Sequence, residues 1–325
     1  MHLPTRPLLG ALLAALLTSA AAHPATDPSS ATRAKAARFW VDPNTAAARQ
    51  AAAYRAQGRT SDARLIDRIA TRPQATWLYG PDPGPTVKAV TTAAQRAHRT
   101  AVLVTYYIPH RDCGAYSSGG APDAAAYRRY IDSFTAGLGT RGAYVVVEPD
   151  AVAATLAGCQ GADPHERHTL LAYALSRIAA RPHTHVYLDA GNASWITDVP
   201  ALATALRASG LNQADGVALN VSNYATNTVT SAYAHRLLTA LDIGAHYVID
   251  TSRNGNGPYT GPDAWCNPPG RALGTPPTTR TDDPTLDAYL WVKHPGESDG
   301  ICRGGPAAGT WWEETGLELA RNAKG

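Results

Sequence analysis

The chain has 325 residues, in which 29 Lys and Arg against 26 Asp and Glu give a net charge of +3 at pH 7. Neither sign of charge forms a block, so the composition argues against nucleic acid and against a membrane surface as partners. Behind a short N-terminal signal about 300 residues remain, enough for one large α/β domain and also compatible with two smaller domains.

The N-terminus predicts a signal peptide over residues 1–22. Arg6 precedes an apolar run over residues 8–17, and small residues lead to a cleavage site near Ala22. The run is shorter than the roughly 20 apolar residues that cross a bilayer, and no later segment approaches that length. We therefore expect a secreted, extracellular protein without a membrane anchor. Residues 23–37 predict a flexible leader, and residues 38–325 a single folded domain.

From there on, short β-branched runs alternate with helical patterns. The clearest helix follows Pro122, which suits its first turn, and its apolar residues recur at helical spacing: Tyr127, Tyr130, Ile131, Phe134 and Leu138. This alternation predicts an α/β fold with parallel strands joined by helical crossovers, and seven strands favour a barrel-like closure over an open sheet. The predicted strands cover residues 74–78, 100–108, 143–147, 185–188, 216–221, 246–249 and 288–292.

Polar side chains follow six of the seven predicted strands. Because the carboxyl ends of parallel barrel strands meet at one face, these segments predict an active site there. They hold several carboxylates but no Gly-x-Ser-x-Gly and no phosphate-binding motif. Paired carboxylates supply the acid and base that hydrolysis of a sugar polymer needs. The segments are residues 109–113, 148–150, 189–192, 222–224, 250–255 and 293–299.

Four tryptophans lie at or near predicted strand ends: Trp77, Trp195, Trp265 and Trp291. A single tryptophan at such a place is as well explained by core packing. Four together favour platforms on which the apolar faces of sugar rings stack.

Four cysteines form an even set in a chain that we expect to be exported and oxidised. Three pairings are possible, and we favour the one between sequence neighbours, Cys113 with Cys159 and Cys266 with Cys302. No Cys-x-x-Cys or His-x-x-x-His spacing accompanies them, so we expect neither a metal nor a cofactor.

Six segments together resemble glycoside hydrolase family 6, from about Phe39 to Gly300. In this family, inverting cellulases include both endoglucanases and cellobiohydrolases. The resemblance implies a distorted seven-stranded parallel β/α barrel, similar to a TIM barrel, and a β-1,4-glucan as substrate. The segments are YYIPHRDC (106–113), VEPD (147–150), YLDAG (187–191), LNVSNY (219–224), DTSRNGNG (250–257) and WVK with GESDG (291–293 and 296–300).

The resemblance also implies roles for three aspartates. Asp150 matches the proton donor, and Asp112 matches an aspartate that tunes this donor and relays a proton from the attacking water. Asp299 matches the carboxylate proposed as the base. From the residues alone, two other interpretations stay open: Asp112 as the ion-pair partner of Arg111, and Asp150 as a helix N-cap, which is compatible with catalysis.

Further residues match substrate-binding positions of the family. Tyr106 is expected beneath a distorted sugar ring, and Asp189, Asn223, Lys293 and Glu297 are expected to bind hydroxyl groups. The favoured disulfide pairing matches the two disulfides of the family. The chain departs from the pattern at Asn192, where many members have His after Asp-Ala-Gly, so the charge that a histidine can carry at that subsite is missing here.

Short segments between the motifs favour an open cleft and an endo-acting enzyme, and we expect the enzyme to be monomeric. The alternatives are a cellobiohydrolase, which encloses its substrate under long loops, and a non-catalytic glucan-binding relative. The latter requires the loss of a catalytic carboxylate, whereas Asp112, Asp150 and Asp299 are all present.

Overall fold

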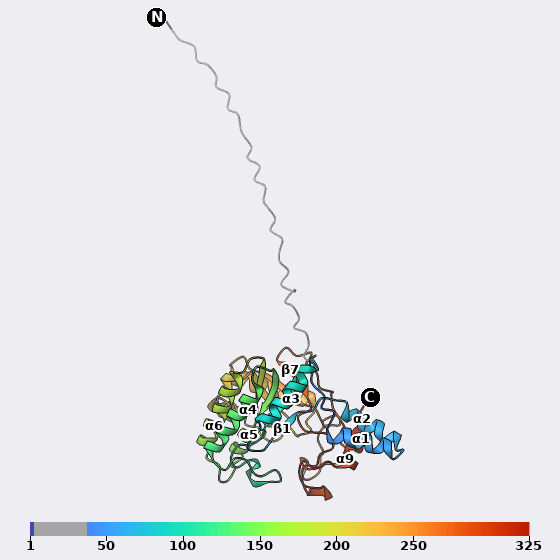
Figure 1. Cartoon of the computed structure of the whole chain (residues 1–325). Helices are drawn as coiled ribbons and strands as arrows, with labels where there is room; N and C mark the ends of the chain where they lie inside the picture. Colours follow the sequence, from blue (N-terminus) through green and yellow to red (C-terminus); the bar gives the residue numbers. More distant parts are fainter. Residues whose placement is uncertain (3–37, 325) are drawn as a thin grey trace. The chain divides into compact units, whose positions relative to one another are not determined.

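The computed structural model describes residues 1–2 and 38–324 (Figure 1). The predicted signal peptide and leader therefore lie outside the described residues, apart from Met1 and His2. No helix among the described residues is long and apolar enough to cross a membrane.

Seven parallel strands form one sheet in the order of the sequence, so all seven predicted strands are confirmed. The second is shorter than predicted, because the chain leaves the sheet after Thr105. The strands are β1 (Thr76–Leu78), β2 (Ala101–Thr105), β3 (Ala143–Val147), β4 (Thr184–Asp189), β5 (Gly216–Leu219), β6 (His246–Asp250) and β7 (Leu286–Leu290).

The sheet curls into a distorted barrel that closes incompletely. No ladder joins β1 to β7 within residues 38–324. Two hydrogen bonds cross this seam instead, from Ala75 N to Trp291 O (3.0 Å) and from Trp77 Nε1 to Val292 O (2.8 Å). The predicted barrel is therefore correct, with an open seam between its first and last strands.

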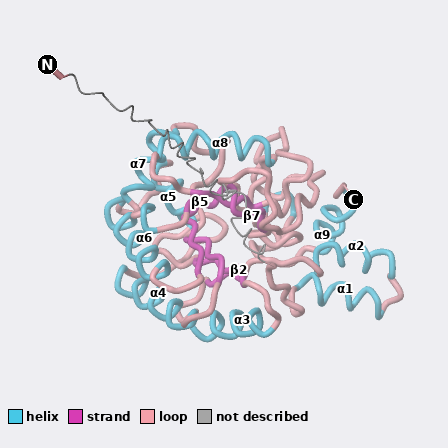
Figure 2. The backbone as a smooth tube through the Cα atoms, turned by 90° about the horizontal axis from the view of Figure 1, so that it is seen from above, coloured by secondary structure: helices cyan, strands magenta, loops and turns pink. Residues whose placement is uncertain are grey.

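Helices cover the outside of the sheet (Figure 2). Alternate strand residues such as Leu103 and Val145 face these helices, while Val104 and Val146 fill the interior of the barrel. Along the chain the covering helices are α3 (Gly84–Arg96), α4 (Ala124–Leu138), α5 (Ala151–Leu156), α6 (Pro164–Ala179), α7 (Val199–Ala208) and α8 (Asn227–Leu241).

The helix expected after Pro122 is α4, and the five apolar residues that predicted it are buried. Its N-cap is Asp123, whose side chain accepts a hydrogen bond from Ala126 N (2.7 Å). Pro122 therefore lies before the cap, and its predicted place in the first turn is wrong.

Three helices from the two ends of the described chain pack together beside the barrel: α1 (Ala46–Ala56), α2 (Thr60–Ala70) and α9 (Glu313–Asn322) (Figure 2). Ile66 and Ile69 of α2 share an apolar cluster with Leu317 of α9. Arg68 fastens the two helices, since its guanidinium donates to Ala320 O (2.8 Å) and Ala323 O (3.1 Å).

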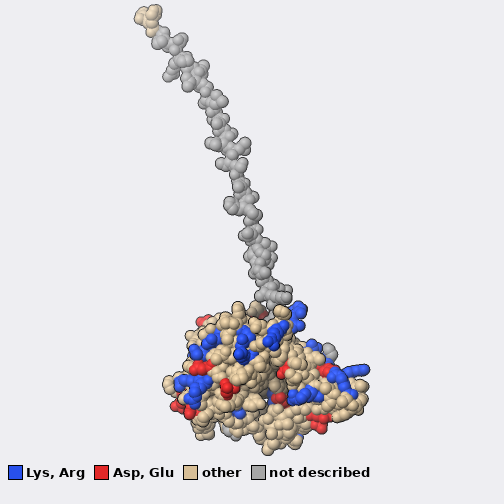
Figure 3. Space-filling view, viewed as in Figure 1, with Lys and Arg blue, Asp and Glu red and all other residues tan. Residues whose placement is uncertain are grey.

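Basic and acidic side chains are interspersed on the face of the molecule shown in Figure 3. Neither sign forms a continuous stripe on that face.

Candidate active site

The turn after β3 holds two carboxylates in opposite environments. Both Glu148 (φ 46°) and Asp150 (φ 70°) have left-handed backbone conformations, which turn the chain sharply into α5. Glu148 is fully buried and accepts hydrogen bonds from Tyr107 N (3.0 Å), Ile108 N (3.0 Å) and Tyr127 Oη (3.1 Å). Glu148 therefore fixes the end of β2, and Asp150 is the carboxylate of this motif that stays available for chemistry.

Asp150 lies among other carboxylates. Its side chain does not cap α5, so the N-cap hydrogen bond is not formed, although Asp150 occupies the cap position. Burial raises the pKa of Asp150 well above its ordinary value, and the negative charges of Asp189 and Asp112 raise it further. Such a group keeps its proton to a higher pH than an exposed aspartate does.

Asp112 begins a short 3₁₀ turn, η2 (Asp112–Gly114), in the loop after β2. Its carboxylate accepts a hydrogen bond from Ser117 N (2.6 Å), and burial raises its pKa. Arg111 donates instead to Tyr106 O (2.8 Å) and Ser117 O (2.8 Å), and its guanidinium lies over the ring of Tyr106. The interpretation of Asp112 as an ion-pair partner of Arg111 is therefore wrong.

Asp189, at the end of β4, is placed differently from its predicted role in binding hydroxyl groups. Its side chain is fully buried, and Oδ1 accepts hydrogen bonds from Asp150 N (2.9 Å) and Gly191 N (3.0 Å). Burial raises its pKa to about 7, which these two bonds partly oppose. No part of its carboxylate reaches the surface, so the predicted sugar contact is wrong. Asp189 instead holds the backbone of the Asp150 turn in place through its hydrogen bond to Asp150 N.

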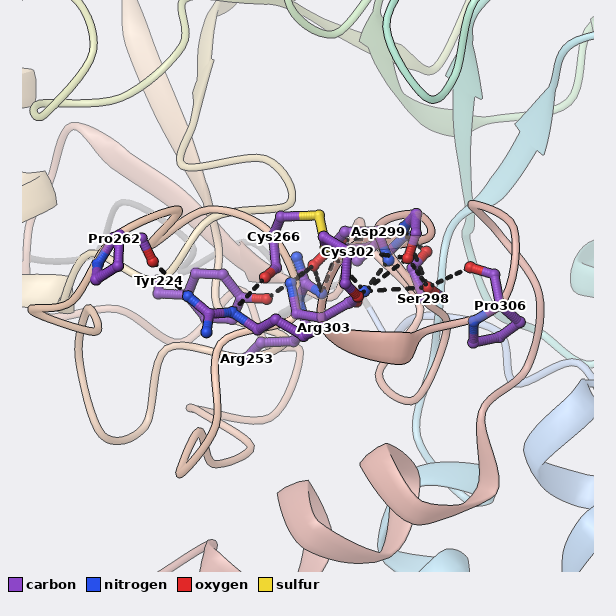
Figure 4. The surroundings of a disulfide bond; sticks show 12 residues. Tyr224, Arg253, Pro262, Cys266, Ser298, Asp299, Cys302, Arg303 and Pro306 are labelled. Atoms are coloured by element: carbon purple, nitrogen blue, oxygen red, sulfur yellow. Dashed lines mark hydrogen bonds and ion pairs between the residues drawn. A yellow bond between two sulfur atoms is a disulfide. The ribbon is translucent and has the colours of Figure 1, made fainter.

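Asp299, after β7, is surrounded by donors and cations (Figure 4). Arg253 Nη1 donates to both of its oxygens (2.9 Å each), and Tyr224 Oη and Asn267 N each donate at 3.0 Å. Lys293 Nζ lies 3.6 Å away. Although burial alone would raise the pKa of Asp299, Arg253 and Lys293 lower it below the ordinary value. Asp299 is therefore ionised over the whole neutral range.

The predicted aromatic residues separate into exposed and buried ones. Trp195 and Trp265 are 39% and 50% exposed, as platforms for a ligand must be. Trp77 is half-buried and packs edge-on against Tyr106, with ring centroids 5.0 Å apart. Trp291 is only 2% exposed, because its indole packs in the cluster of α1, α2 and α9, so its prediction as a sugar platform is wrong.

The other residues that were predicted to bind substrate also follow strands, and they differ in solvent exposure. Asn192 is 4% exposed, and its amide oxygen accepts hydrogen bonds from the backbone and the hydroxyl of Ser194. Asn223 and Glu297 are half-buried. Glu297 is paired with His294 (2.7 Å), which itself contacts the carbonyl of Ala75 across the barrel seam.

Both predicted disulfides are confirmed, Cys113–Cys159 and Cys266–Cys302. The first joins the Asp112 loop to the segment after α5. The second joins the long loop after β6 to η4 (Cys302–Gly304), which follows Asp299 (Figure 4). Each disulfide thus fixes a loop that carries one of the candidate catalytic aspartates.

The sequence interpretation assigned no role to Arg253, Tyr224 or Asn267. Arg253 and Tyr224 lie within the polar strand-end segments, which was a usable signal. Asn267 lies in the loop between β6 and β7, where no pattern marks it. Among the described residues no group of three or more His, Cys, Asp or Glu is placed to hold a metal ion.

A β/α barrel with crowded aspartates at the carboxyl ends of its strands, and exposed indoles in the loops beyond them, is typical of a glycoside hydrolase. The chain matches Glycosyl hydrolases family 6 over residues 34–323 and belongs to that family. It is 43% identical over 291 residues to Endoglucanase A of Cellulomonas fimi, which covers 88% of this chain and 61% of that protein. It is 39% identical to Endoglucanase 1 of Streptomyces halstedii, over 97% of both chains.

Solved structures of relatives have the same fold. The endoglucanase Cel6 from Mycobacterium tuberculosis, in complex with methyl-cellobiosyl-4-deoxy-4-thio-β-D-cellobioside, matches with a TM-score of 0.81 and 43% identity, over 88% of this chain and 97% of that one. The catalytic core domain of the cellobiohydrolase Cel6A from Chaetomium thermophilum matches with a TM-score of 0.79 and 25% identity, over 89% and 97%. The chain spans about three fifths of the length of the Cellulomonas fimi relative.

Proposed function

We propose that the chain is a secreted, monomeric endo-β-1,4-glucanase that hydrolyses cellulose or a related β-1,4-glucan with inversion. The observation that carries the proposal is the setting of Asp150, a carboxyl group with carboxylate neighbours and no cation bonded to it. The relatives named as endoglucanases and the cello-oligosaccharide analogue in the Mycobacterium tuberculosis structure support the choice of substrate.

In this mechanism Asp150 gives its proton to the glycosidic oxygen while the bond from that oxygen to the anomeric carbon breaks. A water molecule attacks the anomeric carbon from the opposite face and loses a proton toward a carboxylate, and Asp112 is the proposed relay. Asp299 is ionised when the water molecule attacks, because Arg253 and Lys293 hold its pKa down. Its negative charge stabilises the positive charge that develops on the sugar ring in the transition state. Asp299 is also the proposed final acceptor of the proton from the attacking water.

Trp195 and Trp265, which are exposed, are the proposed platforms for sugar rings. Trp77 is a half-buried candidate that packs against Tyr106, and Tyr106 is proposed to lie beneath the distorted ring. Asn223, Lys293 and Glu297 are proposed to bind hydroxyl groups. Exposed indoles and short segments between the motifs favour a cleft that a polymer enters anywhere along its length.

The initial product anomer tests the reaction. Direct displacement by water at a β-linkage gives the α-anomer, which proton NMR detects within the first minutes, before mutarotation. An initial β-anomer would indicate a covalent intermediate and would contradict the mechanism.

The rival activity, that of a cellobiohydrolase, has support in the similarity to the Chaetomium thermophilum enzyme. Viscosity of a soluble cellulose derivative separates the two. An endo-acting enzyme lowers the viscosity before many reducing ends appear, whereas early release of cellobiose with little change in viscosity would identify a cellobiohydrolase. No new reducing ends at all would identify a binding protein.

A further inference from the structure

A buried arginine on α6 contacts both loops that carry the donor and its neighbouring aspartate. Arg167 is 3% exposed. Its Nη2 donates to Pro109 O (3.0 Å) and His110 O (3.1 Å), and its Nη1 donates to Ala151 O (3.3 Å). One guanidinium thus joins the loop after β2 to the first residue of α5.

The three accepting carbonyls lie next to the catalytic aspartates in the sequence. His110 precedes Asp112 by two residues, and Ala151 directly follows Asp150. The planar guanidinium presents several N–H groups in a fixed geometry, so it holds these carbonyls at defined positions relative to one another. A movement of Arg167 would therefore move one loop against the other.

A buried cation is an expensive means of packing, because burial of charge costs free energy that neutral carbonyls only partly restore. Burial indeed lowers the pKa of Arg167, and the negative charge of Glu148 opposes this effect. An apolar side chain of similar volume would fill the same space at lower cost. What it would not supply is a rigid connection between the two loops.

We infer that Arg167 is a positioning residue that fixes the separation of the Asp112 and Asp150 carboxyl groups. The inference rests on the proposed function, since it gives a role to a distance that matters only if Asp150 is a proton donor. Nothing in the sequence marks Arg167, which lies near the N-terminus of α6.

The expected effect on pH dependence follows from the groups around the donor. Asp189 acts on Asp150 from β4, and Asp112 acts on it from the loop after β2. Arg111 lowers the pKa of Asp112, and Ser117 N stabilises its charged form. If Asp112 moves away, Asp150 feels less like charge, its pKa falls, and the donor loses its proton at a lower pH.

Arg167→Lys tests the inference because lysine keeps the charge but cannot reach three carbonyls at once. We expect kcat on an unactivated glucan to fall about 10- to 100-fold, with KM nearly unchanged, and the basic limb of the pH profile to move to lower pH. Arg68→Lys is the matched control, since Arg68 also binds backbone carbonyls, but between α2 and α9. It should leave both kcat and the pH profile as in the wild type.

A second measurement does not depend on how much of a variant folds. It is the ratio of activity on an aryl cellobioside with a good leaving group to activity on the glucan, for Arg167→Lys and Arg167→Gln. A misplaced donor raises this ratio, because a good leaving group needs little protonation. An unchanged ratio together with an unmoved basic limb would overturn the inference, whereas an inactive wild type would instead overturn the proposed function.

Discussion

Asp150 and Asp299 lie on two sides of the strand-end face and have opposite pKa shifts. At the ends of β2, β3 and β4, Asp112, Asp150 and Asp189 crowd together without a bonded cation, and the pKa of each is raised. At the ends of β6 and β7, Arg253 and Lys293 surround Asp299 and lower its pKa. One curled sheet thus keeps one carboxyl group protonated and another ionised at the same pH, which is what general acid catalysis beside a developing positive charge requires.

Removing the proton donor should produce the largest effect. Asp150→Ala should lower kcat on unactivated glucan by about 10²–10⁴-fold, because protonation of the leaving oxygen is needed only in the transition state. KM should change little, and a substrate with a good leaving group should be hydrolysed with a smaller loss. Steady-state kinetics on both substrates measures this, with circular dichroism as the control for folding. A folded variant that keeps more than about a tenth of wild-type kcat would show that Asp150 is not the acid.

Removing the guanidinium of Arg253 beside Asp299 should lower both the stability and the activity of the enzyme. Arg253→Met leaves Asp299 buried without its main partner, so unfolding should become easier by about 3–5 kcal/mol. Asp299 must be ionised to act, and its pKa should rise, so the acidic limb of the pH profile should move to higher pH. Arg177→Met is the control, because its pair with Asp132 is exposed and should contribute less than about 1 kcal/mol. Equal losses of stability in denaturant titrations would contradict the comparison.

Opening each disulfide tests how strongly the two sides depend on covalent fixation. Cys113→Ser with Cys159→Ser, and separately Cys266→Ser with Cys302→Ser, should each lower the free energy of unfolding by about 2–4 kcal/mol. The closed loops are of similar length, with sequence separations of 46 and 36. Thermal melting measures the loss. A loss of stability in only one of the two double variants would contradict the expectation that both disulfides stabilise the fold to a similar extent.

The smallest effect concerns the buried carboxylate behind the donor. Asp189→Asn removes a negative charge that raises the pKa of Asp150, so the donor should lose its proton at lower pH and the basic limb should move to lower pH. The pH dependence of kcat measures the displacement, with kcat at the optimum expected to stay within about tenfold of wild type. A basic limb that stays in place or moves to higher pH would contradict the role assigned to Asp189.

The sequence predicted which strands and loops form the site better than it predicted the burial and hydrogen bonding of the side chains. Short, largely apolar runs located all seven strands, and polar residues after them located the face, because both signals are local. The burial of Trp291 is not local, since it depends on helices more than 200 residues earlier in the chain. The burial of Asp189 is not local either. Asp189 is the last residue of β4, and its carboxylate accepts a hydrogen bond from the backbone of Asp150 in the turn after β3.

The packing of α9 against α1 and α2 has a consequence for the order of folding. Ile66 and Ile69 find their partner Leu317 only after about 250 further residues have joined the chain, so this cluster closes at the largest sequence separations in the domain. A nascent chain that already contains every strand would still expose the apolar faces of α1 and α2. The apolar cluster of α1 and α2 is therefore completed only when α9 has been synthesised. A premature stop just before α9 would yield a chain that is prone to aggregation and sensitive to proteases.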